Sequence, residues 1–251
     1  MNIAVCVKQI PDPATPYELD DENHWVIRPE DQVLDDTDRS GVEIALQLAE
    51  ATEGTVTLYS MSPSGSLQGI RQALAMGADA AVLVDDPELK GADALTTARV
   101  LAAAMQQQGF DLVVAGTEST DGYTGIMPQM MSEILDVPCL SFARKVDAGD
   151  GSVTIERQTA DGFDVVTAPI PALITVTAGI EPRYPTFKGI MQAKSKPVTT
   201  LTSAELGISN TTHQIIRSVE PVAARAAGEI VEDEGEAYLR IIEVLEQAKV
   251  V

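Results

Sequence analysis

Residues 111–135 read DLVVAGTESTDGYTGIMPQMMSEIL, and this stretch decides the fold because it joins three elements in a fixed order. A continuous apolar run at 111–115 leads into a loop of small residues at 116–127 and then into a helical stretch at 128–135. A strand that is apolar throughout, without alternation, is typical of a parallel sheet covered by helices on both faces. The stretch therefore predicts a strand-loop-helix unit of an α/β protein.

The same alternation extends over the first 137 residues. Further continuous apolar runs lie at 3–7, 55–61 and 80–84, with helical periodicity at 37–51, 67–76 and 92–105. Gly77 and Gly109 follow the last two helical stretches, and we expect them to act as C-terminal caps with positive φ. The pattern predicts an α/β fold with a mostly parallel, doubly wound sheet and helices on both faces.

After Pro138 the pattern changes to strand followed by strand, at 140–146, 152–157, 165–167 and 172–176, which predicts added antiparallel strands. From about residue 211 a polar stretch leads to an amphipathic helix at 236–249. Its apolar positions are Leu239, Ile242, Val244, Leu245 and Ala248. We expect an α/β domain at 1–210 and a C-terminal arm at 211–251, whose helix either docks on another protein or packs on its own domain.

The composition excludes several classes of function. The 251 residues include 38 acidic and 17 basic side chains, so the net charge is −21. A chain this acidic repels nucleic acid and anionic membrane surfaces. Because it has neither a secretory leader nor an apolar run near the roughly 20 residues that span a bilayer, we expect a cytoplasmic protein without direct membrane insertion. Cys6 and Cys139 lie in apolar runs and are expected to be buried thiols.

The sequence lacks the common catalytic and metal-binding patterns. His24 and His213 lie in polar, loop-like sequence, and neither has a second His or Cys at ligand spacing, so no metal site is expected. No nucleophile elbow, Walker A or Gly-x-Gly-x-x-Gly motif occurs. Ten acidic residues between Asp12 and Asp38 are interpreted as a solvated surface. We therefore expect no catalytic residue.

Two segments suggest ligands or partners. The loop at 116–127 lies between a strand and a helix start, where free N–H groups and the helix dipole favour phosphate, although glycines there can also serve turn geometry alone. The segment at 183–196 holds four of the 17 basic residues and no acidic one, together with Phe187, Ile190 and Met191. It is either an exposed apolar knob with a basic rim or a buried hydrophobic staple followed by a solvated helix.

Four motifs resemble one family over essentially the whole chain. They are VKQIPD at 7–12, ALAMGAD at 73–79, Ala115-Gly116 with Asp121-Gly122, and above all EPRYPTFKGIMQAK at 181–194. Together they resemble the β subunit of electron transfer flavoprotein. The resemblance implies an adenine-nucleotide-binding fold with universal-stress-like topology at 1–210, a partner-docking loop at 183–196, and an arm at 211–251 that docks on an α subunit.

The resemblance also implies a function. The α subunit would carry most contacts to one redox-active FAD, while the β subunit would bury an AMP. The heterodimer would accept electrons singly from acyl-CoA-type dehydrogenases and pass them to a membrane quinone oxidoreductase or another acceptor. The chain would then be an electron carrier subunit, not an enzyme.

Site residues are carried over by position. The AMP pocket would comprise Cys6, Asp35, Asp36, Thr37, Asp38, Met61, Gly116, Asp121, Gly122, Tyr123, Thr124, Gly125, Ile126 and Met127. The docking residues would be Tyr184, Phe187, Lys188, Ile190, Met191, Lys194 and Lys196. Phe187 replaces the family's anchoring leucine, and Gln158 replaces a glutamate that steadies the flavin domain in many members, so a domain contact is expected to be weaker.

Three alternatives stay open at this point. In bifurcating relatives the β subunit holds a second FAD in place of AMP, and the sequence does not reveal the volume of the pocket. A universal-stress-type nucleotide-binding module would share the sheet and the phosphate loop, but would need neither the basic segment nor the arm. An ATP-cleaving enzyme would need a phosphate-binding lysine or metal-binding carboxylates on the loop, for which Asp121 alone is thin support.

Overall fold

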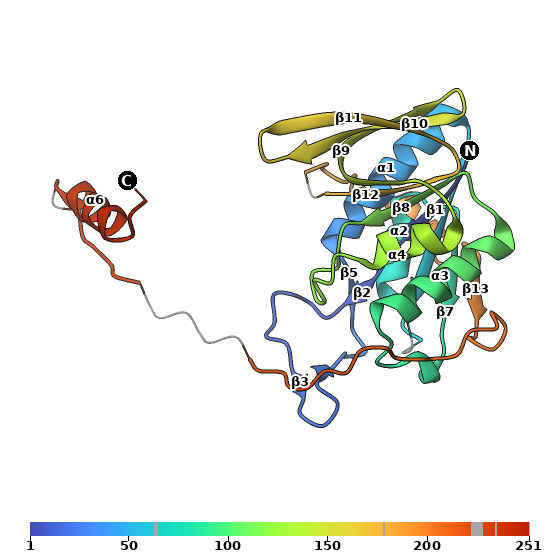
Figure 1. The fold of residues 1–251 in the computed structure, drawn as a ribbon, viewed down its shortest axis with the longest axis horizontal. Helices are drawn as coiled ribbons and strands as arrows, with labels where there is room; N and C mark the ends of the chain where they lie inside the picture. The colour runs from blue at the N-terminus through green and yellow to red at the C-terminus, as the bar shows by residue number, and fades with distance from the viewer. Residues whose placement is uncertain (63–64, 178, 222–227, 234, 251) are drawn as a thin grey trace. The chain divides into compact units, whose positions relative to one another are not determined.

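The computed structural model describes residues 1–62, 65–177, 179–221, 228–233 and 235–250. They form two units, Met1–Val219 and Glu220–Val251. The larger unit is built on one nine-stranded sheet, and the smaller contains helix α6 (Ala237–Gln247), which has no buried residue (Figure 1). Residues 222–227, 234 and 251 of the expected arm lie outside the described residues.

The large sheet is mostly parallel, as predicted. Its order is β11-β10-β9-β12-β8-β1-β6-β7-β13, and every neighbouring pair from β9 to β13 is parallel. The strands, in chain order, are β1 (Asn2–Cys6), β6 (Thr55–Met61), β7 (Ala80–Val84), β8 (Leu112–Gly116), β9 (Cys139–Gly149), β10 (Ser152–Thr159), β11 (Gly162–Pro169), β12 (Ala172–Val176) and β13 (Val198–Leu201).

Helices cover both faces of this sheet. α1 (Asp36–Thr52) and α2 (Gln68–Met76) pack on one face, and α3 (Ala94–Gln108) and α4 (Met127–Leu135) on the other, with a short 3-10 helix at Pro87–Leu89. In β1, Ile3 and Val5 belong to the first core cluster and Ala4 and Cys6 to the second. Because both sides of each strand are buried, the strand sequences are continuously apolar. Gly77 and Gly109 end α2 and α3 at φ values of 149° and 74°, which confirms the two caps.

The order of the strands identifies a switch point at the carboxyl edge of the sheet, between β1 and β8. From β1 the chain adds β6 and then β7 on one side, whereas β8 returns to the other side of β1. The chain therefore reverses its winding direction between β1 and β8. In open parallel sheets, ligands bind at the carboxyl ends of the strands at such a switch point. The loops after β1 and β8 are consequently where a ligand is expected.

Three features differ from the sequence expectation. β9 and β12 join the parallel part of the sheet, so the antiparallel addition is the β9–β10–β11 meander alone. The strand β13 beside β7 was not predicted, and the docking loop contains helix α5 (Phe187–Ala193). Residues 9–34 form two small antiparallel pairs, β2 (Gln9–Ile10) with β5 (Val33–Leu34) and β3 (Leu19–Asp20) with β4 (Trp25–Val26).

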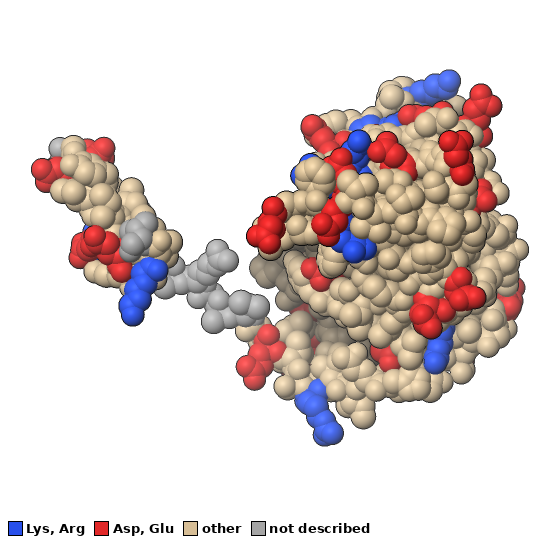
Figure 2. Space-filling model, turned by 45° about the horizontal axis from the view of Figure 1, so that its top comes forward, with Lys and Arg blue, Asp and Glu red and all other residues tan. Residues whose placement is uncertain are grey.

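The surface agrees with the acidic composition. Figure 2 shows acidic side chains scattered over the face that it draws, with fewer basic ones among them. Among the described residues, no helix could cross a membrane and no group of His, Cys, Asp and Glu is arranged to hold a metal ion. Both cysteines are free, and Cys6 is buried as expected, but Cys139 is only partly buried.

Candidate functional site

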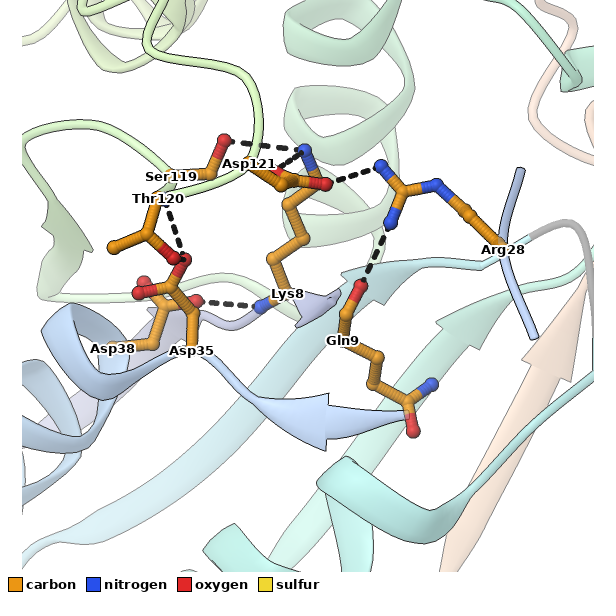
Figure 3. Close-up of polar contacts among 8 residues, drawn as sticks. All are labelled: Lys8, Gln9, Arg28, Asp35, Asp38, Ser119, Thr120 and Asp121. Carbon is orange, nitrogen blue, oxygen red and sulfur yellow. Dashed lines mark hydrogen bonds and ion pairs between the residues drawn. The ribbon is translucent and has the colours of Figure 1, made fainter. Parts of the chain in front are cut away.

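Side chains from three segments meet at the switch point between β1 and β8 (Figure 3). Lys8 follows β1, and its Nζ lies 2.7 Å from Asp121 Oδ1 and 3.1 Å from Ser119 Oγ. Arg28 contacts the other oxygen of Asp121, whose side chain is only 1% exposed. Burial raises the pKa of Asp121, but the positive charges of Lys8 and Arg28 outweigh it and lower the pKa below its ordinary value. Asp121 is therefore an ionised carboxylate held by two cations.

Asp35 connects this cluster to α1. Its Oδ1 accepts a hydrogen bond of 3.0 Å from the backbone N–H of Thr37, which makes Asp35 the N-cap of α1. Its Oδ2 accepts from the N–H and the hydroxyl of Thr120, at 2.7 Å and 3.0 Å. Its own N–H donates to Lys8 O at 3.0 Å. One fully buried carboxyl group thus ties together the end of β1, the start of α1 and the loop after β8.

Asp38 is a second buried carboxyl group one turn further into α1. Its Oδ2 accepts from the backbone N–H of Lys8 at 2.6 Å. Burial, reinforced by the negative charge of Asp35, raises the pKa of Asp38 well above its ordinary value and so favours its neutral form. A Cβ on Gly116 would lie 2.8 Å from Asp38 Oδ1 and 3.1 Å from Thr37 Cγ2. Glycine is therefore required where β8 passes α1.

The loop after Asp121 presents free donors. Among the described residues, the backbone N–H groups of Thr124, Gly125, Ile126 and Met127 have no acceptor. Gly125 adopts φ 62°, and Ile126, the N-cap of α4, provides no side-chain cap. Uncapped N–H groups at a helix start carry partial positive charge and bind anions. Thr124, Gly125, Ile126 and Met127 therefore present four N–H donors that are available to a ligand.

The side chains near the loop carry no excess of positive charge. Lys8 and Arg28 both pair with Asp121, Asp35 accepts from Thr120, and Asp38 favours its neutral form. The carboxyl group of Glu118 lies close to Gly125, 3.2 Å from where a Cβ on that residue would be. An anion placed at this site would meet no excess positive charge from side chains. Its stabilisation would come from the N–H groups at 124–127 and from the dipole of α4.

The structure brings together some of the predicted pocket residues and separates others. Asp35, Thr37, Asp38, Gly116 and Asp121 lie in one cluster. Cys6, Met61 and Met127 pack with the α3–α4 side of the core, and Asp36 is exposed beside Arg39. On the loop, Gly125 is partly buried, and Gly122, Tyr123, Thr124 and Ile126 are exposed. Asp36 therefore points away from the cluster.

Sequence reasoning missed four residues of the cluster, namely Lys8, Arg28, Ser119 and Thr120. A signal was available for two of them, because Lys8 directly follows a buried strand and Arg28 is an isolated cation within the acidic stretch. The interpretation of residues 12–38 as a solvated surface was wrong for Asp35 and Asp38, both of which are buried. Their burial depends on contacts with the loop after β8, which local sequence does not reveal.

The segment at 181–196 is anchored at its start and exposed further on. Arg183 forms ion pairs with Glu43 at 2.8 Å and Glu50 at 2.5 Å, both on α1. Burial raises the pKa of Glu43, but hydrogen bonds from Arg183 outweigh it and lower the pKa overall. Tyr184 and Phe187 are 85% and 82% exposed, and Ile190 and Met191 are also exposed. The exposed knob is therefore present, and the buried staple is not.

The basic residues of this segment are not equivalent. Lys196 Nζ donates to the carbonyl oxygens of Leu74, Gly77 and Ala78 at 3.0, 3.0 and 2.6 Å, so it caps the end of α2. Among the described residues, Lys188 and Lys194 pair with no carboxylate, whereas Arg183 is paired with two. The expected basic rim is thus reduced to Lys188 and Lys194.

The comparisons with known proteins agree with one another. A family model described as the electron transfer flavoprotein domain matches residues 24–206. The electron transfer flavoprotein subunit beta of Mycobacterium bovis is 40% identical over all of this chain and 99% of its own length, and that of Megasphaera elsdenii is 33% identical over the full length of both. The caffeyl-CoA reductase-Etf complex subunit CarD of Acetobacterium woodii is 31% identical over 92% of each chain. The chain belongs to the electron transfer flavoprotein β-subunit family.

Proposed function

We propose that this chain is the β subunit of a heterodimeric electron transfer flavoprotein that binds AMP at the loop 116–127. Together with an FAD-bearing α subunit it carries electrons from acyl-CoA-type dehydrogenases to a quinone oxidoreductase or another acceptor, in the cytoplasm. It acts as an electron carrier subunit, not as an enzyme. The observation that carries the proposal is the buried Asp35, which holds the loop after β8 beside four free N–H groups at the switch point of the sheet.

AMP suits this site because a nucleotide monophosphate carries one anionic group. The N–H groups at 124–127 would hold that phosphate, and Gly125 allows close approach. Lys8 is already paired with Asp121, so it orients the loop and is not a free phosphate ligand. This arrangement supports a nucleotide with a structural role. FAD, shared with the α subunit, supplies the one-electron chemistry when bound.

The segment at 183–196 is the docking surface for the donor dehydrogenase. Phe187 projects from α5, which is anchored through Arg183 and begins with the N-cap Thr186, whose hydroxyl accepts from Gly189 N at 3.0 Å. Interfaces concentrate their binding energy in a few apolar or aromatic residues. Phe187 is therefore the anchor, accompanied by Tyr184, Ile190 and Met191, while Lys188 and Lys194 steer association. Lys196 acts indirectly, because it positions α5 against α2.

The C-terminal arm docks on the α subunit. Helix α6 exposes five large apolar side chains, Tyr238, Leu239, Ile241, Ile242 and Val244. Exposed apolar groups gathered on one short helix are typical of interaction surfaces in soluble proteins. Gln158, which is exposed on β10, offers an amide in place of a carboxylate to the flavin domain, so that contact lacks an ion pair.

The docking role is tested by electron transfer from a dehydrogenase. Phe187→Ala in the heterodimer should slow steady-state reduction by an acyl-CoA dehydrogenase at least tenfold, since about 1.4 kcal/mol corresponds to a factor of ten. Reduction by dithionite should not change. Ile134→Ala, which removes a similarly apolar side chain from α4 on the other face of the sheet, is the control and should behave as wild type. A wild-type rate for Phe187→Ala would exclude this segment as the docking site.

A further inference from the structure

A groove of about 560 Å³ runs along α2 beside the docking segment. Its floor is one face of α2, formed by Gln68, Arg71, Gln72, Ala75 and Met76. The spacing of these residues corresponds to a single helical stripe over the whole length of α2. The walls come from Arg39 on α1, from residues 181–185 and from α5. The groove is separate from the cluster around Asp121, since the two share no residue.

The lining of this groove contains more basic than acidic side chains. Arg39 Nε is buried and makes no hydrogen bond, and its nearest carboxylate is the exposed Asp36 at 3.5 Å. Arg71 donates to the carbonyl oxygen of Ala193, and Lys194 pairs with no carboxylate among the described residues. The lining also contains Arg183, which pairs with Glu43 and Glu50, and one acidic residue, Glu181, so Arg71 and Lys194 are the lining cations without a carboxylate partner among the described residues. In a chain of net charge −21, such an excess favours an anionic occupant.

The groove also has an apolar part. Ala75 and Met76 are buried at its floor, while Tyr184 and Ile190 stand exposed at its wall. A surface that combines an apolar hollow with two cations that lack a carboxylate partner in the described part of the chain, Arg71 and Lys194, fits a group that is apolar at its centre and acidic at its edges. An apolar side chain flanked by Asp or Glu on a protein surface has this chemistry.

The groove shares residues with the docking segment, and this overlap indicates which partner would cover it. Tyr184, Ile190 and Lys194 line the groove and also belong to the docking segment, whose Phe187 is exposed on the same short helix. A protein that receives Phe187 would therefore also cover the groove. We propose that the groove receives an apolar side chain, flanked by carboxylates, that projects from the electron-donating dehydrogenase, so that the two proteins interlock in both directions. This inference rests on the proposed docking function.

Two substitutions test the inference in the assembled heterodimer. Gln68→Trp would fill the groove from an exposed position that makes no side-chain hydrogen bond among the described residues, and Arg39→Glu would reverse its charge. The assay measures kcat and KM for the heterodimer with an acyl-CoA dehydrogenase that reduces the wild type. Both variants should raise KM at least tenfold with dithionite reduction unchanged, and Gln68→Trp should also keep the wild-type melting temperature. The effect of Arg39→Glu should shrink as salt rises, whereas that of Gln68→Trp should persist.

Matched controls lie on α3, on the other face of the sheet. Gln107→Trp and Arg99→Glu make the same chemical changes at exposed positions there and should keep the wild-type KM. Wild-type KM values for both groove variants would overturn the inference. Phe187→Ala, measured in parallel, separates the two proposals: if it raises KM while the groove variants do not, only the groove fails. If Phe187→Ala is also without effect, the docking function itself fails.

Discussion

Replacing Asp35 by alanine should both destabilise the larger unit and release the loop at 116–127, which we propose binds AMP. The carboxyl group of Asp35 accepts three hydrogen bonds, one from the N–H of Thr37 and two from Thr120. The first caps α1, and the other two hold the loop after β8. No neighbouring side chain replaces these bonds in Asp35→Ala, so the donors of Thr120 lose a buried, charged acceptor.

The expected cost follows from these bonds. Loss of an N-cap costs about 1 kcal/mol. Loss of a charged acceptor by buried donors costs about 1.5–3 kcal/mol. The sum is roughly 3 kcal/mol, which lowers the melting temperature of a unit of this size by roughly 6–12 °C. Asp35→Asn keeps an oxygen acceptor for the cap, so it should lose less than half as much.

The assay combines thermal unfolding with nucleotide release. Asp93→Ala is the control, because Asp93 caps α3 by accepting from Thr96 N at 2.8 Å and lies outside the site. Asp93→Ala should lower the melting temperature by a few degrees, from the loss of about 1 kcal/mol, and retain AMP. Asp35→Ala should lower it further and lose AMP. Equal AMP contents in the two variants would refute the idea that Asp35 holds the loop.

Three further predictions follow from single residues. Gly125→Val should lose the nucleotide, because a branched side chain at φ 62° costs on the order of 1–3 kcal/mol. Gly122→Val, at negative φ, should retain more AMP than Gly125→Val, and the AMP content per heterodimer of the two variants tests this difference. The raised pKa of Asp38 means that the folded state keeps its proton to a higher pH than the unfolded chain does, so stability falls as pH rises above the ordinary carboxyl range. Asp38→Asn should make this fall in melting temperature shallower, and an unchanged slope would contradict the prediction. Lys196→Met should lower the melting temperature by removing the cap of α2 while leaving the salt dependence of dehydrogenase association intact, and Lys188→Met should do the opposite.

Much of the fold was predictable because its strands and helices carry strong periodic signals. The apolar runs of β6, β7 and β12 were predicted to the residue, since burial on both faces leaves little room for polar side chains. The strand β13 was missed because it is four residues long and includes Thr199 and Thr200, both exposed. The sequence predicted a helix in the segment of α5 only as part of the alternative with a buried staple, because Pro185 and Gly189 are typical of turns. In the structure, Gly189 lets α5 approach α2, where a Cβ would lie 2.5 Å from Ala75 O.

The site was predictable only in part. The loop at 116–127 stands out because small residues follow a buried strand, a local signal. The residues that hold this loop are distant in sequence: Asp35 and Thr120 are separated by 85 positions, and Lys8 and Asp121 by 113. No local pattern encodes such contacts. The direction of Lys196, inward to α2, likewise depends on the packing of α5 and α2.

AMP binding by this chain, in a heterodimer with an FAD-bearing α subunit, is the core of the proposed function. The most direct test is to co-express the two chains, purify the complex, release its cofactors with acid and count them by chromatography and absorbance. We expect a yellow heterodimer that yields one FAD and one AMP. Two FADs and no AMP, or a stable β chain that alone carries stoichiometric FAD, would contradict the proposed function.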